Sequence, residues 1–183
     1  MANGRSSDEL VFAPLGGLGN QGILSSPYTL QFAAGSSFCE GSACPCGNDP
    51  ATGTWVGCLS SLGQGARLRG SGSQSITNAN LLLFGSQMPN SNALYLASNG
   101  QTSSVLGDGR FCLGGTIIRL GTKTNAGGVS QFPDVGDPLL SVRGGVTPGS
   151  GVTRAYQTYY RNSAAAFCPP ETFNVTSGWA IVW

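Results

Sequence analysis

Short stretches of alternating apolar and polar residues, separated by glycine-rich turns, recur along most of this chain. The clearest is residues 153–162, whose content of Thr and Tyr is typical of strands. Residues 80–84 form a nearly continuous apolar run, which favours a buried strand. Similar segments are residues 9–13, 28–32, 66–70, 93–97, 116–120, 139–143, 173–176 and 179–183. Short strands joined by turns are therefore the expected building unit.

A helical period is nearly absent from the sequence. Only residues 163–167 have helical propensity, and they span about one turn. Short strands with glycine-rich turns between them predict an all-β fold, either an antiparallel β-sandwich or a jelly roll with disulfides. A chain of 183 residues makes one domain the default. We divide it into a Gly/Ser-rich N-terminal extension, residues 1–36, and a disulfide-stapled β-sandwich, residues 37–183.

The chain has six cysteines and no histidine, and both facts narrow its function. An even number of cysteines in a Gly- and Ser-rich chain predicts disulfides, and so an extracellular or cell-surface location. Residues 1–10 lack the apolar segment of a signal peptide, so we expect the export leader to be absent from this chain. Without histidine, Ser-His-Asp and Cys-His catalysis is excluded.

The spacing of the cysteines argues for disulfides over a metal site. It matches neither the paired knuckles of zinc sites nor the plant-type iron–sulfur pattern, so we expect no cofactor. Cys44 and Cys46 flank Pro45 and are too close to pair without strain. We expect Cys112 to pair with Cys168 and the other four cysteines to pair locally as a cap. The full set is Cys39, Cys44, Cys46, Cys58, Cys112 and Cys168.

Charge is sparse, which limits the classes of partner. Only 9% of residues are charged and the net charge is +1, so no basic stripe for nucleic acid is present. No apolar run is long enough for a membrane span, so we expect no membrane insertion. A weakly charged surface has little repulsion to oppose association. The expected partners are other copies of this chain or another extracellular protein.

Acidic residues give only weak candidates for chemistry. Asp134 and Asp137 share one loop and are weak calcium candidates, although Asp and Gly are also ordinary turn formers. A glycosidase needs two facing carboxylates, and Glu40, Asp108 and Glu171 lie near cysteines in the sequence. Nothing in the pattern selects a pair, so we expect no enzymatic activity and no catalytic residue.

Aromatic residues offer a second type of candidate site. Tyr159 and Trp183 are the candidates for exposed platforms that stack on sugar rings, whereas the other aromatics are expected to fill the core. The N-terminal extension offers a third type, because an apolar segment there is suited to adding as a strand to a neighbouring subunit. The candidate residues of this assembly strand are Ile23, Leu24, Tyr28, Leu30 and Phe32.

Several short motifs give the chain a family resemblance. They include CPCGN at residues 44–48 and GDGRFC at residues 107–112, with further matches at residues 57–59, 63–68, 119–122, 141–144, 160–162 and 167–168. From about residue 38 to the end, the chain resembles an uncharacterised secreted Cys-rich β module found at the C-terminal part of large bacterial extracellular proteins. The resemblance implies export, β structure and disulfides, and it implies no catalytic residue.

Taken together, these features predict a non-enzymatic extracellular module that acts in a surface structure or assembly. The alternative is a glycan-binding module that uses an exposed aromatic with Asn, Gln and Arg side chains. A carboxylate-based hydrolase is the weakest of the three hypotheses, since it requires two acids that face each other in a cleft.

Overall fold

The computed structural model describes residues 34–75 and 78–183 of the chain, and it is built almost entirely from antiparallel strands. The expected all-β fold with disulfides is confirmed. The elements are β1 (Ser36–Phe38), β2 (Arg67–Ser71), β3 (Gln74–Ser75), β4 (Asn78–Ala79), β5 (Leu82–Ser86), β6 (Asn92–Leu106), β7 (Gly109–Thr124), β8 (Ser130–Phe132), α1 (Leu140–Arg143), β9 (Thr153–Arg161), β10 (Phe173–Val175) and β11 (Gly178–Val182). No helix in the described ranges has the length and apolar character to cross a membrane.

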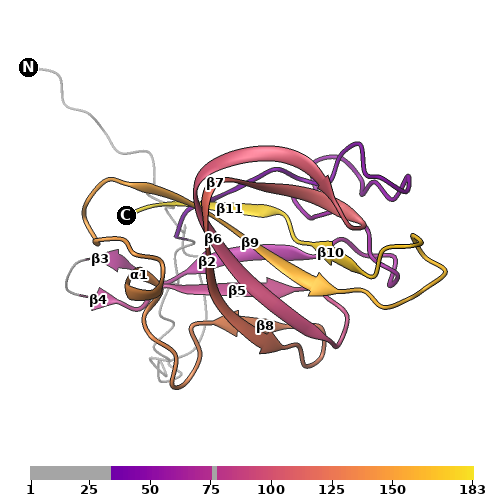
Figure 1. Ribbon diagram of the computed structural model, residues 1–183. Helices are drawn as coiled ribbons and strands as arrows, with labels where there is room; N and C mark the ends of the chain where they lie inside the picture. The colour runs from indigo at the N-terminus through magenta and orange to yellow at the C-terminus, as the bar shows by residue number, and fades with distance from the viewer. Residues whose placement is uncertain (1–33, 76–77) are drawn as a thin grey trace, which may run out of the picture. The chain divides into compact units, whose positions relative to one another are not determined.

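The strands form two main sheets, which Figure 1 shows stacked on each other. The larger has the order β1-β11-β9-β6-β7, with β10 paired to β9, and the smaller has the order β2-β5-β8. Strands β3 and β4 form a separate small hairpin. Strands β6 and β7 are 15 and 16 residues long, much longer than the apolar segments at 93–97 and 116–120 that predicted them. The polar ends of the hairpin stay extended because the two strands satisfy each other's backbone groups.

The core lies between the two sheets and follows from the two-residue period of their strands. Leu68, Leu83 and Phe132 point inward from the smaller sheet, while Arg69 and Phe84 point outward. The larger sheet supplies a matching inner face, made of Tyr95, Ala97, Leu120, Tyr156, Trp179, Ile181 and Trp183. Apolar surface from both sheets is therefore removed from water at one shared interface.

One buried tryptophan links β11 of the larger sheet to β2, the edge strand of the smaller sheet. Trp179 of β11 donates its indole N–H to the carbonyl of Ala34 at 2.7 Å, and the Ala34 N–H donates to the carbonyl of Gly70 in β2 at 3.2 Å. Gly70 has no room for a side chain, because a Cβ there would lie 2.5 Å from the Ala34 oxygen and 2.6 Å from the Trp179 indole nitrogen. Position 70 of β2 therefore requires glycine, because Ala34 and Trp179 approach its backbone closely.

The boundary of the N-terminal extension falls inside the sandwich. Strand β1 begins at Ser36 and pairs with β11, and Ala34 already bonds to β2. A division between residues 36 and 37 therefore cuts through β1. The candidate assembly-strand residues Ile23, Leu24, Tyr28, Leu30 and Phe32 lie outside the described residues.

The expected strand at residues 139–143 is wrong, because the chain forms the helical turn α1 there. The turn closes at Gly144, whose N–H donates to the carbonyl of Leu140 at 2.8 Å. Leu140 is buried and Leu139 is exposed, so one side of the turn packs on the core. The Arg143 side chain then donates to the carbonyl of Leu120 at 2.9 Å. Tertiary packing here overrides a short alternating pattern.

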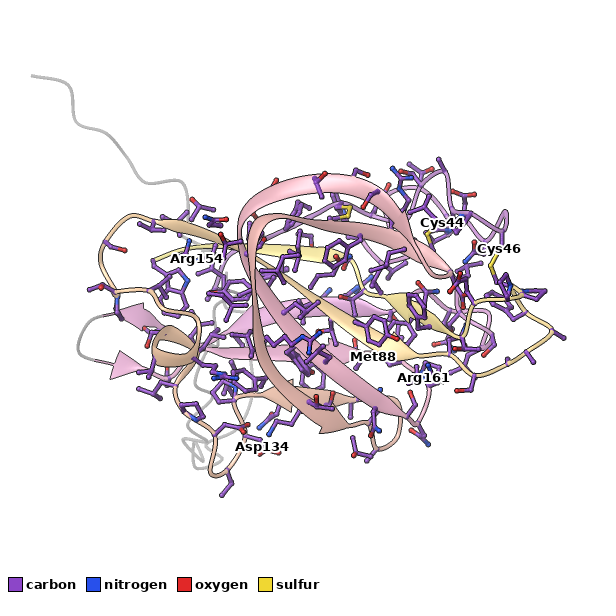
Figure 2. All side chains as sticks on the ribbon, in the orientation of Figure 1. Cys44, Cys46, Met88, Asp134, Arg154 and Arg161 are labelled. Atoms are coloured by element: carbon purple, nitrogen blue, oxygen red, sulfur yellow. A yellow bond between two sulfur atoms is a disulfide. The ribbon has the colours of Figure 1, made fainter. Side chains whose placement is uncertain are left out.

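Residues 39–66, which we call the cap loop, contain no strand longer than an isolated bridge and are held by disulfides. The pairs are Cys39–Cys112, Cys44–Cys58 and Cys46–Cys168, with Cα–Cα distances of 6.4, 5.9 and 5.9 Å. Figure 2 shows Cys44 and Cys46 at the same end of the sandwich. The expected Cys112–Cys168 pair is wrong. Each of these cysteines takes a partner from the cap loop, so two bridges fasten the loop to β7 and to the β9–β10 connection.

Removing the Cys46–Cys168 bridge is expected to destabilise the protein by about 2–5 kcal/mol, because it closes a chain separation of 122 residues. The double variant Cys46→Ala/Cys168→Ala tests this by urea unfolding under non-reducing conditions. The matched control is Cys44→Ala/Cys58→Ala, whose bridge spans 14 residues and should cost less unfolding free energy. A peptide map that links Cys112 to Cys168 in the unmodified protein would contradict the connectivity.

Candidate functional site

The indole of Trp183 lies in the core, so the expectation of an exposed platform there is wrong. Its exposed fraction is 3%, and its N–H donates to the hydroxyl of Tyr156 at 2.8 Å. Trp179, Ile181 and Trp183 share one face of β11, as the two-residue period predicts. That face turns toward the smaller sheet, which the period alone does not specify.

Tyr159 is half-buried on the other face of the larger sheet. Its ring packs against that of Phe173 with the centroids 4.8 Å apart, and it borders a small apolar cluster that includes Leu96 and Leu113. Tyr159 therefore remains partly accessible, but as one side of an aromatic pair. Its role in ligand binding stays a prediction.

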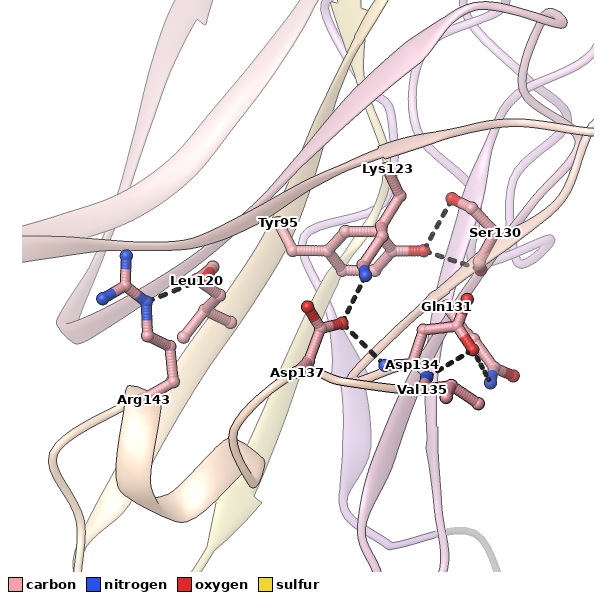
Figure 3. Close-up of polar contacts among 9 residues, drawn as sticks. All are labelled: Tyr95, Leu120, Lys123, Ser130, Gln131, Asp134, Val135, Asp137 and Arg143. Atoms are coloured by element: carbon pink, nitrogen blue, oxygen red, sulfur yellow. Dashed lines mark hydrogen bonds and ion pairs between the residues drawn. The ribbon is translucent and has the colours of Figure 1, made fainter.

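The loop that carries Asp134 and Asp137 is organised around a lysine. Figure 3 shows Asp137 paired with Lys123 while it accepts the backbone N–H of Asp134, at 2.7 Å. Asp134 in turn accepts the N–H of Val135 at 2.8 Å. The hydrogen bond from Lys123 lowers the pKa of the Asp137 carboxyl. Lys123 therefore supplies the positive charge beside Asp137. No group of three acidic or cysteine ligands occurs in residues 34–75 and 78–183. These observations give no support to a calcium site at Asp134 and Asp137.

Two of the acids near the cysteines, Glu40 and Asp108, take part in contacts with the cap loop. Both oxygens of Glu40 accept the backbone N–H of Gly53, and one also accepts that of Trp55, all at 3.0–3.1 Å. Asp108 is 1% exposed, beneath the cap loop. The hydrolase hypothesis gains no support from these positions, since one carboxylate fastens a loop and the other is inaccessible to a substrate.

An open cavity of about 660 Å³ lies where the cap loop meets the edges of β1, β2 and β11. Its walls are formed by Trp55, Arg67 and Arg69, and its lining continues to Ser37, Thr54 and the edge of Trp179. Trp55 is 49% exposed, which is unusual for a side chain that normally supplies core packing. The cavity therefore joins a large aromatic surface to two guanidinium groups.

The cap loop holds Trp55 in place through its backbone. Trp55 has a φ of +53°, in the left-handed region that β-carbon sterics disfavour, and its N–H donates to Glu40 at 3.1 Å. Arg67 donates from Nη2 to the carbonyl of Thr54 at 2.5 Å. The loop on which Trp55 stands is thus fixed to Glu40 on one side and to β2 on the other.

The cavity wall formed by β2 has a concentrated positive charge. Arg67 and Arg69 are two residues apart and therefore project from the same face of the strand. Burial, and then the neighbouring charge of Arg69, lower the pKa of the Arg67 guanidinium. Among the described residues, neither arginine forms a salt bridge.

Sequence reasoning missed Trp55 because the cysteine-rich segment was read only as a staple. One signal was available. Trp55 lies in a turn-rich stretch whose residues do not alternate between apolar and polar, so the sequence does not predict that it belongs to a core strand. The alternation at residues 66–70 did place Arg67 and Arg69 on one face. That these arginines face the Trp55 loop depends on Cys44–Cys58 and on contacts between distant segments.

A second polar cluster lies beneath the cap loop and is buried. Asp108 accepts from the side-chain amide of Asn162 at 2.5 Å, and its backbone carbonyl accepts from Asn48 at 2.9 Å. The other carboxyl oxygen of Asp108 is buried and has no hydrogen-bond partner among residues 34–75 and 78–183. Burial raises the pKa of Asp108, the Asn162 hydrogen bond opposes this, and the charge of Glu171 adds to it. We assign the cluster a structural role in fastening the cap loop.

Asp108→Asn is expected to gain stability relative to the unmodified protein as the pH rises from about 4 toward neutrality. The raised pKa means that the folded state binds the proton more tightly than the unfolded state, whose pKa is about 3.9. The stability from this group is therefore present at low pH and lost as the pH rises through the folded pKa. Urea unfolding across this pH range measures the difference.

Asp108→Ala serves as the matched control for this change. It should show the same pH trend relative to the unmodified protein, but with a constant loss of about 1–3 kcal/mol, because Asn162 loses its acceptor. A difference between Asp108→Asn and the unmodified protein that does not vary with pH would count against an ionised, destabilising carboxyl in the cluster.

No family model, curated protein or solved structure matches this chain. The resemblance to secreted Cys-rich modules therefore stays a prediction from the short motifs. What the chain binds or does has to be inferred from the geometry of the Trp55 cavity and from the sheet edges.

Proposed function

We propose that this protein is an extracellular glycan-binding module whose site is the cavity formed by Trp55, Arg67 and Arg69. The observation that carries the proposal is the half-exposed indole of Trp55, held on a fastened loop beside two arginines. The three disulfides are compatible with an oxidising compartment. As in the glycan-binding hypothesis from the sequence, an exposed aromatic acts together with arginine, but the aromatic is Trp55 in place of Tyr159 or Trp183.

The chemistry of the cavity suits a sugar ring. An indole presents a flat apolar face that packs against the C–H face of a pyranose, and the rigid ring loses little side-chain entropy on binding. Arginine supplies several N–H donors in a fixed fork, which suits ring hydroxyls and carboxylates. A sugar ring can stack through one face while the hydroxyls at its edge accept hydrogen bonds. An indole beside two guanidinium groups is therefore well matched to a glycan.

The backbone of Trp55 supports a functional role for its side chain. Left-handed φ values at residues other than glycine cost free energy, and such residues cluster at binding sites. Here the unfavourable backbone conformation of Trp55 is offset by contacts that hold the loop, through Glu40, Arg67 and the Cys44–Cys58 disulfide. A side chain kept exposed at such a cost is more easily explained by a ligand than by stability.

Trp55→Ala is expected to weaken glycan binding at least tenfold, about 1.4 kcal/mol, because it removes the stacking surface. Affinity electrophoresis of the unmodified chain against xylan, mannan, β-glucan, alginate and polygalacturonate first identifies a binding polysaccharide, and the variant is then titrated with it. Its thermal unfolding should change little, since the side chain is half-exposed.

Leu62→Ala is the matched control for Trp55→Ala. Leu62 is an exposed apolar residue of the same cap loop, at 55% exposure, and is not part of the cavity lining. Its replacement should leave binding intact. Failure of the unmodified chain to bind any polysaccharide, or equal binding by the Trp55→Ala variant, would overturn the proposal.

A second candidate function is assembly by strand addition, which one feature of the larger sheet favours. In the described part of the chain β7 is the last strand of its sheet, and Gly115, Thr116 and Ile117 along it are exposed. An unpaired strand edge presents backbone donors and acceptors to an added strand. The donor proposed from the sequence, with Tyr28, Leu30 and other residues of the extension, lies outside the described residues.

Deletion of residues 1–33 is expected to abolish concentration-dependent oligomers if the extension supplies the added strand. The deletion stops before Ala34 because Ala34 bonds to Gly70 and is part of the sandwich. Sedimentation velocity at several concentrations compares the two forms. The variant Ile117→Pro, which disrupts the edge of β7, should have the same effect as the deletion, and oligomers that survive both changes would rule out this mode of assembly.

A further inference from the structure

The charge around the Trp55 cavity is the feature that defines its ligand further. Arg67 and Arg69 stand on one face of β2 and line the same cavity. Like charges on one strand face repel each other, and burial, with this repulsion as the smaller cause, lowers the pKa of Arg67. An anion bound between the two guanidinium groups would relieve this repulsion.

The carboxylate near this cavity is already engaged. Glu40 accepts backbone N–H groups from Gly53 and Trp55, which fixes it beneath the loop. The ion pair found in the described ranges, between Lys123 and Asp137, belongs to a different loop. The positive charge of the two arginines therefore has no carboxylate from the described residues as a partner.

The two arginines differ in how much of each side chain is already used. Arg67 donates to Thr54, and its Nε is buried with no hydrogen-bond partner in the described part of the chain. Arg69 is exposed and forms no hydrogen bond or ion pair with the described residues. Arg67 thus holds the Trp55 loop, whereas the guanidinium of Arg69 is the group available to a ligand.

We infer that the cavity selects carboxylated glycans, with the sugar ring on Trp55 and its carboxylate on Arg69, assisted by Arg67. This inference rests on the proposed glycan-binding function and adds the class of sugar. Guanidinium and carboxylate form paired hydrogen bonds, and such charge-assisted bonds are stronger than bonds to neutral hydroxyls. An acidic polymer without sugar rings would satisfy the arginines but not the indole, so we favour uronic acid units over acidic peptides.

The test compares ligands that differ only in charge. Oligogalacturonate and oligomannuronate are titrated against the unmodified chain by calorimetry, alongside their methyl esters, which keep the ring and remove the negative charge. We expect at least one acid to bind about tenfold or more tightly than its ester, and the difference to shrink with added salt. Polyglutamate of similar length should bind weakly.

Arg69→Gln is the decisive variant, because the Arg69 side chain is exposed and no side-chain hydrogen bond or ion pair joins it to the described residues. It should weaken binding of the acid much more than binding of the ester, and so remove most of the preference for the acid. Arg161→Gln, which changes an exposed arginine at the end of β9, is the matched control and should retain the preference. Arg69→Lys should restore it in part, since the charge returns without the fork.

The outcomes separate this inference from the proposed function. If acids and esters bind equally, or only a neutral polysaccharide binds, the inference fails and the glycan-binding function stands. If polyglutamate binds as tightly as the best acidic sugar, charge alone is recognised, and the inference fails. If no saccharide binds at all, both fail.

Discussion

The disulfide attachment of the cap loop is the constraint on which the candidate site depends. Residues 39–66 have almost no strand pairing of their own, and only 9% of the whole chain is charged. The buried apolar residues of this loop, Val56 and Ala66 among them, are supplemented by covalent bridges in offsetting the entropic cost of ordering the loop. The bridges from Cys39 to Cys112 and from Cys46 to Cys168 lower the conformational entropy of the unfolded chain, because they tie the loop to segments far away in the sequence. Less entropy is then lost when the loop becomes ordered.

Buried polar contacts complete the attachment and give the loop one conformation. Asn48 donates to the carbonyls of Leu59 and Asp108, so one amide joins two turns of the chain. Asn174 of β10 also donates to the carbonyl of Leu59. Hydrogen bonds of this kind contribute modest free energy each, but leaving them unmade is costly. The loop that presents Trp55 is therefore specified by polar partners more than by apolar burial.

The two proposed functions use separate parts of the molecule and are compatible with each other. The Trp55 cavity lies at the junction of β1, β2 and β11, while β7, which ends its sheet among the described strands, is at the other end of the sheet order. A module that binds glycans and also associates with copies of itself would gain avidity, because linked sites raise the effective concentration of ligand. Weak single-site binding would then suffice at a cell surface.

The sequence by itself determined the fold class, since period-2 alternation, glycine-rich turns and an even number of cysteines each restrict the backbone locally. It also placed Arg67 and Arg69 on one face, and Trp179, Ile181 and Trp183 on another. Only the tertiary structure decided which faces are buried, which cysteines pair, and that Trp55 rather than Trp183 is exposed. These outcomes depend on contacts between segments that local patterns do not relate, some of them more than a hundred positions apart, such as Trp179 with Ala34 and Cys46 with Cys168.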